Sequence, residues 1–140
     1  MKKLQDYAGA IVFAHVLLMG FDHLAHQRVD LMFALMQNVV LLSVLTVSPL
    51  VAAALLWTRF QRAGAILFLS TMAVAFAFNV YHRYLSAHPS VHSPDVAWYW
   101  ETIFYVSSAL ILVTEILGCW LGTKIVQKLG TSIEAPSSNG

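Results

Sequence analysis

The sequence has little charge and a single cysteine. Only 11% of its 140 residues are charged, whereas soluble domains carry about 25%. Hydrophobic residues make up 59% of the chain, so a water-soluble fold of this size could not cover its surface with polar groups. We therefore expect lipid to form a large part of its surroundings, and a chain of this length to form one domain.

The shortage of cysteine and of net charge excludes several classes of function. Cys119, the only cysteine, cannot form an intramolecular disulfide, a CxxC redox motif or an all-cysteine metal site. A net charge of +1 provides no basic face for phosphates, so no nucleic-acid partner is expected. The basic start and the apolar run after it resemble a signal peptide. However, His15 interrupts that run and Asp22 stands where small cleavage-site residues should be, so no cleavage is expected.

What the sequence does contain is four long apolar stretches. A membrane-spanning helix needs about 20 mostly apolar residues, and the candidates cover about 7–24, 31–57, 63–84 and 98–121. The connections are short, and the longest, 85–97, is rich in serine, histidine and proline. The sequence thus predicts an all-α fold, an integral membrane four-helix bundle. Residues 1–129 are expected to form this four-span domain and residues 130–140 a disordered cytoplasmic tail.

A proline interrupts the second stretch. Pro49 has no N–H group and therefore leaves one helix carbonyl without its usual donor. Membrane helices tolerate this when hydroxyl groups and neighbouring helices satisfy the carbonyl. We expect a kink at Pro49. The hydroxyl groups of Thr46 and Ser48 are placed to satisfy the freed carbonyl.

Basic residues predict the orientation, because cytoplasmic loops carry an excess of lysine and arginine. One side of the predicted bundle has six of them and the other has only Arg28 and Arg83. The six are Lys2, Lys3, Arg59, Arg62, Lys124 and Lys128. Both termini are therefore expected in the cytoplasm.

The run from Phe78 to Tyr84 and the aromatic start of the last stretch resemble small bacterial membrane proteins, which implies the inner membrane but no activity.

Five of the six histidines fall on the non-cytoplasmic side of this layout, and His15 lies about 10 Å below the outer boundary of the membrane. On the first helix, His15, Asp22 and His26 share one face within about 40°, and His23 points away by about 80°. Since polar groups avoid lipid, we expect a pocket in the outer half of the bundle. Its expected lining groups are His15, Asp22, His26, Asn38, Asn79, His82, Glu101 and Tyr105. Glu115 is the one exception in an otherwise apolar inner half.

Imidazole and carboxylate groups together favour a metal ion. The first hypothesis is therefore a divalent metal site for Zn or Cu at the outer mouth. His23, His26, His82 and Glu101 are its central ligands, with Asp22 and His15 as second choices. No HExxH, repeated ExxH or CxxC pattern fixes the geometry of such a site.

Two other hypotheses remain open at this stage. A b-type haem could be held by axial imidazoles, from His15 or His26 on the first helix and His82 on the third. Alternatively, the chain is a non-catalytic accessory subunit, or a lipid- or small-molecule-binding module, of a larger membrane complex. In that case its polar residues are interhelical hydrogen bonds. Its partners are then the bilayer and either a membrane complex or further copies of the chain. Transport is a weaker fourth hypothesis, because the sequence lacks a pair of broken helices.

Overall fold

The computed structural model describes residues 1–28, 43–81 and 98–131, nearly all of them helical or in tight turns. The elements in chain order are α1 Lys2–Arg28, the π-helical turn η1 Ser43–Val47, α3 Ser48–Leu56, α4 Gln61–Val80 and α5 Trp98–Thr131. The all-α prediction is confirmed. The first and third predicted spans overlap α1 and α4. α1 extends further at both ends, and residues 82–84 of the third span lie outside the described residues.

One predicted span is described only in part, and another ends elsewhere in the structure. Residues 31–42 of the second lie outside the described residues, and the described remainder, η1 and α3, is only 14 residues long. The fourth was expected to end near 121, but α5 continues to Thr131 and has 34 residues. At 1.5 Å per residue α5 is about 51 Å long, against about 30 Å of hydrocarbon in a bilayer. Part of α5 must therefore lie outside the hydrocarbon, or the helix must tilt.

A short turn reverses the chain between α3 and α4. Thr58 closes the end of α3 by donating its hydroxyl to the Leu55 carbonyl at 2.8 Å, and it accepts the Phe60 N–H at 3.1 Å. Gly64 lets the start of α4 lie close to the end of α3, since a Cβ atom at Gly64 would lie 2.9 Å from the Leu55 carbonyl carbon. The connection between the second and third apolar stretches is thus short, as predicted, and α4 begins at Gln61.

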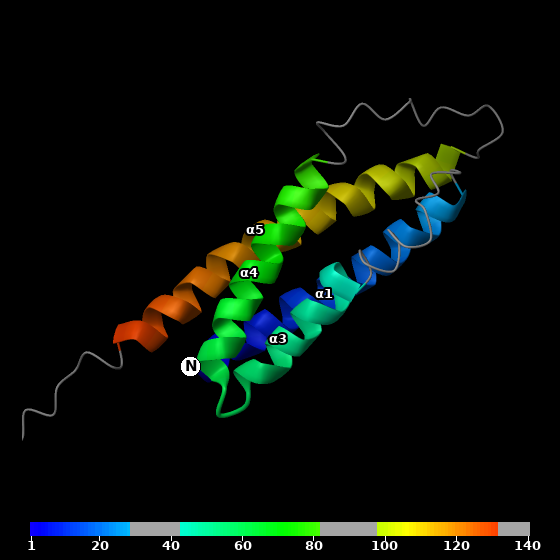
Figure 1. Ribbon diagram of the computed structural model, residues 1–140. Coiled ribbons are helices and arrows are strands. Elements are labelled where there is room, and N and C mark those ends of the chain that lie inside the picture. Colours follow the sequence, from blue (N-terminus) through cyan, green and yellow to red (C-terminus); the bar gives the residue numbers. More distant parts are fainter. Residues whose placement is uncertain (29–42, 82–97, 132–140) are drawn as a thin grey trace, which may run out of the picture.

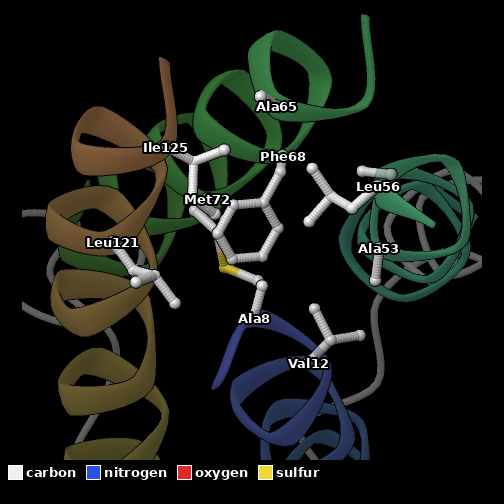
Figure 2. Close-up of a cluster of buried hydrophobic side chains, with 10 residues drawn as sticks. Ala8, Val12, Ala53, Leu56, Ala65, Phe68, Met72, Leu121 and Ile125 are labelled. Atoms are coloured by element: carbon white, nitrogen blue, oxygen red, sulfur yellow. The ribbon is translucent and has the colours of Figure 1, made fainter. Parts of the chain in front are cut away.

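The four α-helices of the described residues form a ring in which each packs against two of the other three. α5 packs against α1 and α4, and α3 packs against α4 and α1 (Figure 1). Phe68 and Met72 of α4 point into the middle of the ring, among small and branched side chains of the other three helices (Figure 2). These neighbours include Ala8 and Val12 of α1, Ala53 and Leu56 of α3, and Leu121 and Ile125 of α5.

Three helices are long and apolar enough to cross a membrane: α1, α4 and α5. Large apolar side chains also face outward along these helices, as Phe13 at 66% and Trp120 at 60% exposure illustrate. A surface of this kind is stable in lipid and would be unstable in water. Length, composition and surface together indicate an integral membrane protein.

The basic residues that predicted the orientation gather at one end of the bundle. Gln5 in the first turns of α1 donates to the Leu56 carbonyl, so α1 begins beside the α3–α4 turn. Leu4 shares a groove with Lys124 and Lys128, so α5 ends there too. We call this the basic end, and it carries Lys2, Lys3, Arg59, Arg62, Lys124 and Lys128. The end where α1 finishes and α5 begins is the opposite end.

Candidate functional site

Eight polar or charged side chains are buried in the described part of the bundle. Each of them takes part in a hydrogen bond to another element. They are Gln5, His15, Asp22, Asn79, Ser107, Ser108, Thr114 and Glu115. Half of them belong to α5, which therefore supplies a polar stripe that contacts α1 on one side and α4 on the other.

Asp22 connects α1 to α5 towards the opposite end. Its Oδ1 atom accepts hydrogen bonds from Ser107 at 3.1 Å and from Ser108 at 3.4 Å. Both hydroxyls also lie within hydrogen-bonding distance of the Phe104 carbonyl of their own helix. The carboxylate thus lies at the interface between the two longest helices, where the sequence predicted a pocket-lining group.

His15 lies at the junction of three elements. Its Nε2 atom is 3.3 Å from the Leu45 carbonyl in η1, and its Nδ1 atom is 3.1 Å from the Thr114 hydroxyl in α5. Leu45 is four residues before Pro49, so it is the carbonyl that loses its regular helix donor to the proline. A carbonyl can only accept, so Nε2 carries the hydrogen in this contact. His15 therefore supplies the hydrogen bond that Pro49 cannot.

This contact changes the interpretation of the Pro49 region. Thr46 and Ser48 were expected to help satisfy the freed carbonyl, but the donor comes from α1. The Thr46 hydroxyl is buried and has no hydrogen-bond partner within the described part of the chain. The π-helical turn ends directly before α3, whose first turn contains the proline, so the helix is irregular where the sequence predicts a kink.

Both ring nitrogens of His15 are engaged, which limits what the residue can do. Thr114 has one hydroxyl hydrogen and two neighbours that could accept it, the His15 Nδ1 atom and the Ile111 carbonyl at 2.7 Å. When His15 is neutral, its Nδ1 atom accepts a hydrogen bond from the Thr114 hydroxyl. When His15 is doubly protonated, Nδ1 is a donor, and the Thr114 hydroxyl donates to the Ile111 carbonyl instead. Ligation of a metal or haem iron by His15 would require one of its two hydrogen bonds to be given up.

Glu115 and Asn79 connect α5 to α4. The Asn79 amide donates to Glu115 Oε1 at 2.6 Å, and both side chains are buried. The sequence placed Asn79 in the outer half of the bundle and Glu115 in the inner half, so their pairing was not predicted. α5 starts where expected and continues ten residues further, so Glu115 lies near its middle. The hydrogen bond to Asn79 places Glu115 level with the last turn of α4.

The described parts of the chain do not assemble the predicted metal ligands. Within residues 1–28, 43–81 and 98–131, no group of three His, Cys, Asp or Glu side chains is placed to share an ion. Asp22 is buried against the serines, whereas His23 faces outward and Glu101 is half-buried. His26 belongs to α1, but its side chain, together with all of Asn38 and His82, lies outside the described residues. The metal site therefore stays a prediction.

Two further sequence expectations can be compared with the structure. Tyr105 was expected to line the pocket, but it is 54% exposed on the outside of α5, so that prediction is wrong. Gln5 was not predicted to matter, yet its amide donates to the Leu56 carbonyl at 2.5 Å. A polar residue one turn into an apolar helix, on the same face as Ala8 and Val12, was the signal available for it.

Comparison with known proteins gives no family for the chain: no family model, curated protein or solved structure matches it.

Proposed function

We propose that this protein is a non-catalytic accessory module of a larger membrane assembly. It would reside in a bacterial inner membrane with its basic end and both termini in the cytoplasm. The observation that carries the proposal is that each of the eight buried polar side chains in the described part of the chain makes a hydrogen bond to another element. Groups that bind or convert a substrate must be accessible to it, whereas these groups hold helices together.

The energetics agree with a structural role for these groups. Interhelical hydrogen bonds in membranes stabilise by about 0.6–2 kcal/mol each, so several of them together hold a small bundle in one register. Lipid gives no hydrophobic driving force between helices, and close packing with polar ties is the alternative. The face left for function is then the exposed apolar surface, which a partner helix could cover.

The test uses the whole protein, extracted in discs of its native membrane and examined by native mass spectrometry. We expect the chain in fixed stoichiometry with a second membrane protein. The isosteric variants Asp22→Asn and Glu115→Gln preserve the hydrogen bonds and should keep that partner. Recovery of the chain alone, or loss of the partner from folded isosteric variants, would contradict the proposal.

A second candidate function is metal binding at the opposite end. The hydrogen bonds from Ser107 and Ser108 to Asp22 bring the end of α1 against the first turns of α5. These two segments carry three of the predicted ligands, His23, His26 and Glu101, and His82 would come from the chain after α4. Such a site would hold Zn or Cu by imidazole and carboxylate groups.

We expect purified protein to contain about one divalent ion per chain if this second function is correct. A variant with alanine at His23, His26 and His82 should lose the ion, while His15→Gln, which changes a histidine engaged inside the bundle, should keep it. Elemental analysis after dialysis against a weak chelator measures the content. The same low metal content in the unaltered protein and the triple variant would reject the site.

A further inference from the structure

A groove lies between α1 and α5 at the basic end. Its volume is about 440 Å³, and its walls combine apolar with cationic side chains. It is lined by Leu4 of α1 and by Trp120, Lys124, Gln127, Lys128 and Thr131 of α5. The α5 residues all fall within about 100° around the helix axis, so they form one face of α5, and Leu4 places that face beside the start of α1.

The groove separates its charges from its apolar groups. Lys124 and Lys128 are exposed one turn apart near the end of α5, whereas Trp120 lies one turn deeper in the helix. Tryptophan is enriched at the depth of lipid headgroups. Lys2 and Lys3 at the start of α1 add positive charge at this end, and Asp6 is the acidic side chain closest to them along the chain.

Beyond Trp120 the same side of α5 continues as an exposed apolar stripe. Leu117, Val113 and Leu110 follow at intervals of three or four residues and are 46%, 50% and 45% exposed. These positions lie within about 80° of Trp120 on the helix. The groove therefore has a cationic mouth and leads into a strip of surface suited to an acyl chain.

From this arrangement we infer that the groove binds an acidic phospholipid. The phosphate lies against Lys124 and Lys128, and an acyl chain follows Trp120 and the stripe below it. Basic pockets between membrane helices bind acidic headgroups in this way. Two lysines near a helix C-terminus also complement the helix dipole, but the dipole does not account for the apolar wall of Leu4 and Trp120. The inference goes beyond the proposed function, because it holds whether or not the chain has a protein partner.

The test is titration of delipidated full-length protein with phosphatidylglycerol and, separately, with phosphatidylcholine, followed by native mass spectrometry. We expect phosphatidylglycerol to bind at one preferred site. The double variant Lys124→Gln/Lys128→Gln should weaken that binding by about 30-fold. The matched control Arg59→Gln/Arg62→Gln removes two charges from the same end, outside the groove, and should change binding less than about threefold.

Three outcomes would overturn the inference. Equal binding of the two lipids would mean that the headgroup charge is not recognised. An equal loss of phosphatidylglycerol affinity in the two double variants would mean that the lipid responds to the total charge of the basic end and not to the groove. Displacement of the lipid by millimolar glycerol 3-phosphate would assign the groove to a free phosphate compound. All four substituted residues are exposed, so both variants should fold, and circular dichroism checks this.

Discussion

Replacing Glu115 with leucine is expected to lower the free energy of unfolding by about 1–3 kcal/mol, because a buried donor then loses its acceptor. The donor is the Asn79 amide, 2.6 Å from Glu115 Oε1 at the contact between α5 and α4. In the bundle interior, water cannot replace the lost oxygen. Unfolding of the protein in mixed micelles by added sodium dodecyl sulfate, followed by circular dichroism, measures the change.

Two companion variants separate the hydrogen bond from the size and charge of the side chain. Glu115→Gln keeps an oxygen where Asn79 donates, so its stability should stay within about 0.5 kcal/mol of the unaltered protein. Asn79→Leu combined with Glu115→Leu removes donor and acceptor together and should recover part of the loss. A Glu115→Leu protein as stable as the original would show that this pair does not connect the helices.

The second large decrease in the free energy of unfolding is expected when His15 is replaced. His15→Leu removes the donor to the Leu45 carbonyl, which Pro49 has already deprived of its helix partner. A buried carbonyl left without a donor costs about 1–3 kcal/mol. Thr114 can still donate to the Ile111 carbonyl, so we expect Thr114→Val to cost less, about 0.5–1 kcal/mol.

The same unfolding titration compares the two variants. A loss at His15→Leu no larger than that at Thr114→Val would mean that the Leu45 contact contributes little. A loss clearly larger would assign most of the effect to the carbonyl beside Pro49. Both replacements are apolar and preserve approximate size, so the comparison does not depend on opening a large cavity.

The fold class could be predicted because it depends on quantities that are visible in one dimension. The apolar stretches indicate that helices are present and roughly where, and Pro49 indicates where one becomes irregular, although α1 and α5 extend beyond their stretches. Angular spacing along α1 also placed His15 and Asp22 correctly on one buried face. These features need only the periodicity of a single helix.

The partners of the buried groups could not be predicted, because they depend on how the helices are rotated and staggered against each other. Asn79 meets Glu115 through the stagger of α4 against α5, which the apolar pattern of either helix does not contain. His15 was considered a metal or haem ligand because its residue type permits ligation, but its nitrogens are directed at Leu45 and Thr114. The position of His15 along its helix, which the sequence does give, does not distinguish these alternatives.

The most direct test of the account is a double-mutant cycle between His15 and Pro49. The alanine introduced by Pro49→Ala would carry the N–H group that proline lacks and could donate to the Leu45 carbonyl. If the buried polar groups serve to complete hydrogen bonds between helices, His15→Leu should cost at least about 1 kcal/mol less in the Pro49→Ala background. Equal losses in the two backgrounds would contradict the account, since the histidine would then serve some purpose other than completing the helix beside the proline.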